Sequence, residues 1–404
     1  MAIFTEETQQ KILTVAQEAK TYLKILANGW KVKDWKAVQM LVQMGAGPSF
    51  FPIGTQLNVA STQYGTLVFD VVAHDHHKNP NDASAHTMDL LMHYGLFKTM
   101  AVDPKELFWA NTTGAEIAAD TTLHFAATGY NKGNYQFTTP VAIPSGAGLY
   151  CDHLYYYSSQ TDILSQGFVL YGSDGSILQD SITVTEGSEG TDMGTLSSTR
   201  ATTVNTLGMF NSISRAGQGS NNYKESYVRQ WLNSDADTAY GWRNPQTPFD
   251  VRPSTDRDYD TLMYQKGFMY GLDGDFLDAV CAVENITARN VIFEYSGELG
   301  GYDTFTDKFW LPSITELGLG NNNGIAEGEV FEFYDGATAT DRIKYQLDDT
   351  STAKNWAVRS ARIGYHPDIS QSIHKINADG SLGNTAGTGG WNQNRSVAVA
   401  CTIA

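Results

Sequence analysis

Short stretches of period-two alternation, separated by clusters of turn residues, constrain the fold of this chain most strongly. Apolar and polar residues alternate in four such stretches, 56–59, 66–72, 123–125 and 135–138. This period is typical of half-buried β-strands. Gly, Ser, Asn and Pro gather between them, as at 144–148. We therefore predict a jelly-roll-like β-sandwich over residues 51–185.

The length of the chain indicates more than one domain. Its 404 residues exceed the ~250 to 300 at which a single core stops growing. The Gly/Ser/Thr-rich segment 186–202 is the predicted linker. We expect a helical anchor or oligomerisation region at 1–50, the sandwich at 51–185 and a second folded domain at 203–404.

Two helices are predicted at the N-terminus. Residues 5–28 place apolar or small side chains three or four positions apart, at Ile12, Val15, Ala19, Tyr22 and Leu26. This spacing suits either a short coiled coil or a helix docked on its own domain. A second helix is expected to start at the capping residue Asp34 and to end at 45–48, with four side chains turned inward, Trp35, Val38, Leu41 and Val42.

The third region mixes helices with strands. Helices are predicted at 223–232 and 275–280, followed by strands at 281–284 and 290–293. Residues 309–313 read as a strand that leads into a short helix. The fold class is therefore α+β here and β in the sandwich.

Charge and cysteine content exclude several classes of partner and site. The formal charge of −17 repels phosphate backbones and anionic lipid, so we expect neither nucleic-acid binding nor membrane insertion. The three cysteines, Cys151, Cys281 and Cys401, are far apart and odd in number, which indicates free thiols. The N-terminus has no secretory signal pattern, so the chain is expected to be made in a cytoplasm.

Five histidines between positions 74 and 93 raise the question of a metal site: His74, His76, His77, His86 and His93, with Asp75 among them. Because neighbouring residues on a strand face opposite sides, only His74 and His76 would share an ion. A solvated loop is the alternative, and no metal ligand is assigned. Acidic clusters at 256–260 and 273–275 match no calcium loop.

Catalytic signatures are absent from the sequence. It has no Gly-x-Ser-x-Gly elbow, no Walker loop and no dinucleotide fingerprint. We therefore predict a protein that is not an enzyme, with no catalytic residues and no cofactor.

Five segments occur in an order that resembles a known family: 222–233, 267–277, 306–318, 355–364 and 376–384. They are similar to the landmarks of a C-type-lectin-like domain in proteins of gut phages and bacteria, a group that includes receptor-binding tropism determinants diversified by retroelements. The resemblance covers about residues 205–404. Segments 35–59, 65–77 and 134–146 resemble the part that accompanies this domain in phage structural proteins. Residues 394–397 depart from the commonest family ending.

The resemblance implies where ligands bind and which residues are structural. We call Trp356, Arg359 and Ser360 the Trp-Arg-Ser element. Binding residues are expected between this element and the last strand, at Tyr365, His366, Asp368, Ser370, Gln371, Ser372, His374, Asn384, Trp391, Asn392 and Asn394. Aromatic and amide side chains suit such a surface. Trp356, Arg359, Ser360 and the turn at 379–380 are expected to be structural.

The expected function follows from this resemblance. We expect a phage virion protein, such as a tail or head fibre component or an adhesin, that attaches to a host cell-surface glycan or protein. Other virion proteins would hold its N-terminal region, and a homotrimer would multiply weak binding. The alternatives are a capsid-decorating or head-fibre protein whose lectin-like domain is mainly structural, and a metal-dependent enzyme built on the histidine cluster.

Overall fold

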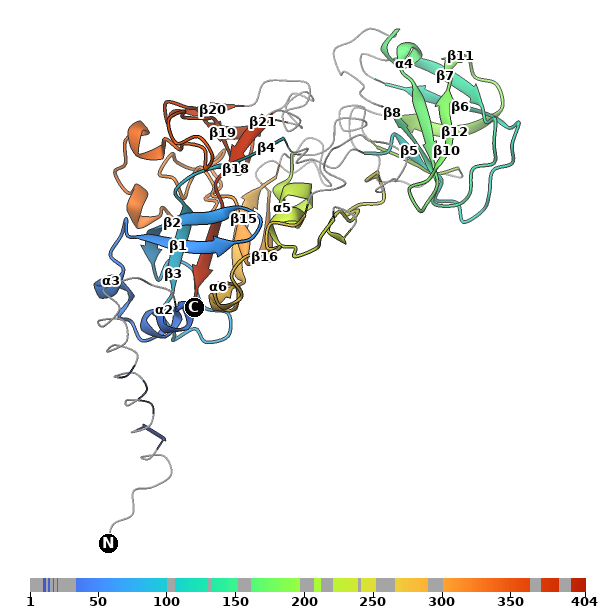
Figure 1. The fold of residues 1–404 in the computed structure, drawn as a ribbon. Coiled ribbons are helices and arrows are strands. Elements are labelled where there is room, and N and C mark those ends of the chain that lie inside the picture. Colours follow the sequence, from blue (N-terminus) through green and yellow to red (C-terminus); the bar gives the residue numbers. More distant parts are fainter. Residues whose placement is uncertain are drawn as a thin grey trace.

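The computed structural model describes most of the chain and is mostly β with few helices (Figure 1). The described residues are 10, 11, 14, 17, 20, 34–99, 106–128, 132–151, 161–196, 207–211, 221–238, 241–251, 266–289, 301–363, 372–384 and 394–404. Among the described helices, none has the length and hydrophobicity that a membrane span requires.

The first sheet joins strands from both ends of the chain. Its order is β1-β2-β3-β22-β14, and β17 also pairs with β22. The bounds are β1 Gln56–Ser61, β2 Gly65–His74, β3 Met88–Met92, β14 Val280–Cys281, β17 Phe309–Trp310 and β22 Ala400–Ile403. The C-terminal strand β22 is therefore hydrogen-bonded to the N-terminal strand β3, with Thr402 opposite Asp89.

A second sheet repeats this combination of distant segments. Its order is β20-β19-β18-β21-β4, with bounds β4 Leu96–Thr99, β18 Trp356–Ala361, β19 Ile373–Ile376, β20 Leu382–Asn384 and β21 Asn394–Val397. A separate hairpin pairs β15 (Val283–Ala288) with β16 (Tyr302–Asp307). The single apolar strand that the resemblance implies at residues 395–401 is thus divided between two sheets, β21 in one and β22 in the other.

Helices cover one face of the first sheet. α2 (Trp35–Gln43) begins after Asp34, whose side chain accepts a hydrogen bond from the Ala37 amide. Trp35 lies 4.7 Å from Phe276 of α6 (Gly274–Ala279) between ring centres, and Phe276 lies 5.6 Å from Phe69 of β2. α2 is therefore a core element of this domain, where an anchor region had been expected. The remaining short helices are α3 Gly47–Phe50, η2 Tyr223–Glu225, α5 Tyr227–Leu232, η5 Glu332–Tyr334 and η6 Ala339–Arg342.

Residues 34–99 and 221–404 share one hydrophobic core in the part of the chain that the structure describes. The strands at 56–99 do not belong to the β-sandwich, in contrast to the predicted boundary at residue 51. Alternation predicts that a strand has one buried face, but it does not identify the sheet that the face packs on.

The β-sandwich is inserted between the two halves of this domain, within residues 106–211. One sheet has the order β10-β9-β8-β5-β13 and the other β11-β7-β6-β12. Their bounds are β5 Trp109–Ala110, β6 Thr122–Ala127, β7 Gly133–Thr138, β8 Gly148–Cys151, β9 Phe168–Tyr171, β10 Ile177–Ile182, β11 Thr185–Glu186, β12 Thr191–Leu196 and β13 Met209–Phe210, with α4 at Thr161–Ser165. Aromatic rings from both sheets fill its core, including Phe108, Phe125, Phe168 and Phe210.

Part of the predicted linker is ordered sheet. β12 pairs with β6 in parallel, and β11 pairs with β7. Thr191, Gly194 and Thr195 therefore belong to a strand, which backbone hydrogen bonds to β6 hold in place. The predicted N-terminal helix lies almost wholly outside the described residues; Gln10, Lys11, Thr14, Gln17 and Lys20 are helical and exposed.

Candidate ligand-binding pocket

Most of the predicted binding residues lie outside the described part of the chain: Tyr365, His366, Asp368, Ser370, Gln371, Trp391 and Asn392. Ser372 is buried, and its carbonyl accepts a hydrogen bond of 2.8 Å from Asn221 Nδ2. His374 and Asn384 face each other across the β19–β20 hairpin. Burial lowers the pKa of His374, although its hydrogen bond to Asn384 opposes that shift. Asn394 begins β21.

The Trp-Arg-Ser element forms a buried polar network. Arg359 donates to Glu316 at 2.6 and 2.7 Å, and neither side chain has any exposed surface. The guanidinium also donates to the carbonyls of Leu311, Ile286 and Glu327. Ser360 donates to the Glu327 carboxylate. These residues hold loops onto β18, in keeping with the structural role expected for them.

The histidines are arranged differently from the prediction. His74 Nε2 lies 3.0 Å from the Phe51 carbonyl, and His93 contacts Asp70 at 2.9 Å. Strand β2 ends at His74, and Asp75 takes a positive φ of 56°. The alternation therefore stops there, and His76 no longer shares a face with His74. His76 and His77 instead lie together near Asp89.

The described acidic cluster has ordinary structural roles. Asp273 caps α6 by accepting from the Phe276 amide, and Asp275 pairs with Lys36 at 3.0 Å. The cluster at 256–260 lies outside the described residues. The two acidic side chains of segment 273–275 therefore cap helix α6 and pair it with Lys36.

Helix α5 forms one wall of a pocket that the sequence did not reveal. Ser226 caps the helix by accepting from the Arg229 amide, and the apolar residues Tyr227, Val228, Trp231 and Leu232 face the core. This spacing turns Arg229, Gln230 and Asn233 toward the other side. Polar side chains on the outer face of a short helix carry no distinctive signal, so sequence reasoning overlooked them.

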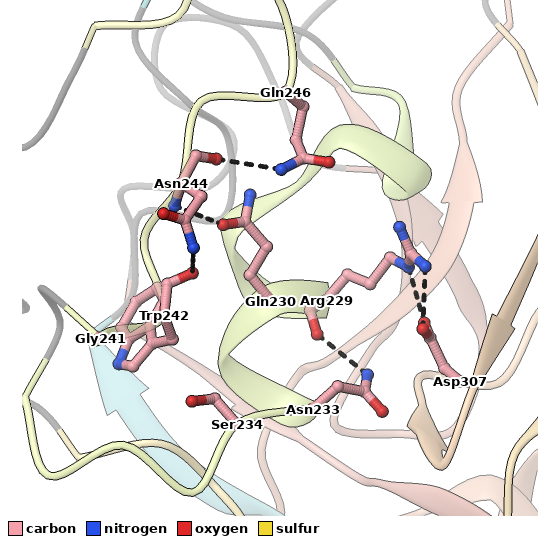
Figure 2. Close-up of a pocket in the computed structure, with 9 residues that line it drawn as sticks. All are labelled: Arg229, Gln230, Asn233, Ser234, Gly241, Trp242, Asn244, Gln246 and Asp307. Carbon is pink, nitrogen blue, oxygen red and sulfur yellow. Dashed lines mark hydrogen bonds and ion pairs between the residues drawn. The ribbon is translucent and has the colours of Figure 1, made fainter.

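The pocket has a volume of about 280 Å³ and a polar lining (Figure 2). This is near the lower end of the ~300 to 1,000 Å³ typical of small-ligand sites. Its walls come from α5, from the segment after it and from the end of β16, and consist of Arg229, Gln230, Asn233, Ser234, Gly241, Trp242, Asn244, Gln246 and Asp307. Four of these nine side chains are amides, which both donate and accept hydrogen bonds.

The charged groups of the pocket neutralise each other. Arg229 Nε and Nη2 donate to the two carboxylate oxygens of Asp307 at 2.7 and 2.9 Å. The guanidinium also lies 5.1 Å from the centre of the Phe305 ring. Burial raises the pKa of Asp307, and the contact with Arg229 opposes that rise. A charged ligand would therefore have to displace a paired group, whereas a neutral polar ligand would not.

One amide donor in this pocket is unused. Gln230 Oε1 accepts from the Asn244 amide at 2.6 Å, while Gln230 Nε2 is buried and has no hydrogen-bond partner. Figure 2 shows the Gln230 side chain beside the segment that carries Asn244, whereas Arg229 turns toward Asp307. A buried donor without an acceptor is unfavourable by about 1 to 3 kcal/mol. A ligand oxygen at this position would remove that penalty.

Asn233 is a wall residue with a structural role. Its Nδ2 donates to the carbonyls of Arg229 and Phe309, and its Oδ1 accepts from the amides of Lys308 and Phe309. It therefore fixes α5 to β17. Gln246 and Asn244 are exposed and form the rim.

The described residues thus form a mostly-β fold with an amide-lined pocket in which the two charged side chains, Arg229 and Asp307, are paired. Residues 197–404 match the family described as "Domain of unknown function (DUF6273)", and the chain belongs to this family. No curated protein and no solved structure matches the chain.

Proposed function

We propose that this chain is a non-enzymatic binding protein that uses the α5 pocket to hold a neutral sugar or amide group on a host cell surface. The unused Gln230 Nε2 donor carries this proposal. Sugar hydroxyls and acetamido oxygens accept from such a donor. They also match the remaining amides of the lining without requiring a free charge.

Electrostatics favours a neutral ligand over an anionic one. Arg229 donates to Asp307 through Nε and Nη2 and to the Lys224 carbonyl through Nη1, so each of its three nitrogens already has an acceptor. The whole chain carries a formal charge of −17, which repels acidic polymers at a distance. Uncharged surface glycans are therefore the preferred class of ligand. An uncharged loop of a host surface protein is the alternative.

Asn221 contacts residues close to both described ends of the predicted binding segment. Asn221, just before η2, donates from Nδ2 to the carbonyls of Arg362 and Ser372. These carbonyls lie on either side of residues 364–371, where several predicted ligand contacts occur.

The biological setting follows the sequence resemblance. We propose a phage virion protein whose lectin-like domain attaches the particle to its host, in a homotrimer held by other virion proteins through the N-terminal region. Each site then binds weakly, and several linked sites raise apparent affinity by roughly 10²-fold or more. The alternative is a capsid-decorating role, which the binding test described next distinguishes from host attachment.

The test is binding of the purified full chain to a glycan array and to intact candidate host bacteria. Gln230→Leu keeps the side-chain volume and removes both polar atoms, so we expect binding to fall at least about tenfold, as for the loss of one buried hydrogen bond. Gln179→Leu, in β10 of the sandwich, is the matched control and should bind like the wild type.

Equal loss in both variants, or no effect of Gln230→Leu on measurable binding, would remove the pocket from the proposal. If the wild type binds no cell or glycan but attaches to purified capsids, the capsid-decorating role is correct. Thermal melting of each variant verifies that folding is retained.

A further inference from the structure

A cluster of three metal-ligating side chains lies outside the α5 pocket. His76, His77 and Asp89 place one possible ligand atom each within 4.8 Å of one another. His77 Nδ1 is 3.1 Å from Asp89 Oδ2. The rings of His76 and His77 are 4.7 Å apart between centres.

The backbone brings the two adjacent histidines to the same place. The positive φ of Asp75 turns the chain after β2, and the Asp75 carboxylate accepts from the Thr87 amide at 3.0 Å. The Thr87 hydroxyl in turn donates to the His77 carbonyl at 2.6 Å. The loop between β2 and β3 is thereby closed on itself, with both imidazoles beside β3.

The surroundings orient each ligand. The His77 ring meets Trp310 edge-on with centres 4.9 Å apart, and the His76 ring lies 4.8 Å from Phe331. Asp89 has no exposed surface and accepts a hydrogen bond from the Thr402 hydroxyl on the neighbouring strand β22. Such supporting contacts are typical of residues that bind a metal.

We propose that His76, His77 and Asp89 bind one divalent transition-metal ion, with Zn²⁺ as the preferred ion. Two imidazole nitrogens and one carboxylate oxygen are a donor set that zinc accepts, whereas calcium and magnesium favour oxygen ligands alone. The ion would tie the β2–β3 loop to the sheet position where the N-terminal and C-terminal strands meet.

The competing interpretation is a buried His77–Asp89 pair without metal. That pair satisfies the Asp89 carboxylate, but it gives no role to His76, which lies within reach of both. The two interpretations predict different behaviour of His76. In the metal site His76 is a ligand, whereas in the metal-free case it lies beside the His77–Asp89 pair and has no part in it.

The experiment uses untagged full-length protein, freed of metal by chelator and dialysis, then titrated with Zn²⁺ by calorimetry with metal content measured by mass spectrometry. We expect one equivalent per chain and a rise in Tm on loading. His76→Gln and His77→Gln should each weaken binding by more than about tenfold. His86→Gln is the matched control in the same loop, because His86 pairs with Asp75 at 2.8 Å and lies outside the cluster.

Failure of the folded wild type to bind a stoichiometric metal would overturn the proposal, as would equal loss of binding in His86→Gln. X-ray absorption of the zinc-loaded wild type provides a readout that needs no variant. Two imidazoles in the coordination shell support the site, and a shell without imidazole contradicts it.

Discussion

At the scale of single residues, a buried ion pair connects β18 to the loops that pack on it. Arg359 satisfies Glu316 and three backbone carbonyls while both side chains are fully buried. A pair of this kind stabilises little relative to an apolar core, but removal of one partner leaves an uncompensated charge. The Arg-Ser pair was visible in the sequence, whereas Glu316 as its partner was decided by the fold.

We expect Arg359→Met to lower the free energy of unfolding by about 3 to 5 kcal/mol, because Glu316 would remain buried and unpaired. Chemical denaturation measures this change. Lys36→Met, which breaks the exposed pair with Asp275, is the control and should change stability little. A similar small effect of both substitutions would contradict the role assigned to the buried network.

Asp250 predicts a specific dependence of stability on pH. Burial, reinforced by the nearby Glu106, raises the pKa of Asp250 to about 7, compared with about 3.9 in an unfolded chain. The folded state therefore holds the proton more tightly. Stability from this group is greatest below pH ~4 and is lost as the pH rises toward ~7, by up to about 1.4 kcal/mol per pH unit.

Thermal melting of the wild type and Asp250→Asn between pH 4 and pH 8 tests this sign. The Asn variant cannot ionise, so its Tm relative to the wild type should increase with pH. Asp235→Asn, at an exposed position, serves as the control and should show a constant difference. A constant difference for Asp250→Asn as well would mean that Asp250 does not titrate as described.

At the scale of elements, turns predicted from sequence are correct where local chemistry defines them. The β19–β20 hairpin turns at Asp379 and Gly380; Asp379 accepts from the Ser381 amide, and Gly380 has a φ of 81°. Strand partners are different, because pairing depends on distant residues. Residues 395–401 were expected to form one apolar strand, yet this part of the chain is divided between β21, which pairs with β18 and β4, and β22, which pairs with β3 and β14.

Gly380→Ala should destabilise the domain by more than the ~1 kcal/mol of a left-handed residue alone. A Cβ at this position would lie 1.7 Å from the Ala339 carbonyl oxygen, so the hairpin must also move. Gly324→Ala is the matched control, with a φ of 86° and open space around its Cβ. Denaturation curves that give equal losses would show that the contact with Ala339 does not matter.

At the scale of the whole molecule, the chain folds as a discontinuous domain with a β-sandwich inserted in it. Residues 34–99 contribute β1 to β4; of these, β3 pairs with β22 and β4 pairs with β21 from the C-terminal part of the chain. The family match begins only at residue 197. The segment that matches the family therefore lacks half of the first sheet and part of its core.

We expect residues 197–404 expressed alone to show no cooperative thermal transition, because β22 would lose β3 and the helix-covered face would lose Phe69 and its neighbours. Residues 34–404 should melt cooperatively. Addition of residues 34–99 as a separate chain should restore a transition to the fragment. A cooperative melt of the isolated fragment would show that the N-terminal strands are dispensable.

The sequence by itself determined the β-rich character, the cap of α2 at Asp34 and the turn at 379–380, since these depend on local periodicity and on residue chemistry. Only the tertiary structure decided that the first strands pair with the last, that His77 approaches Asp89, and that α5 walls a pocket. Such contacts join residues far apart in the chain, and a period-two pattern specifies which face is buried without specifying the partner that buries it.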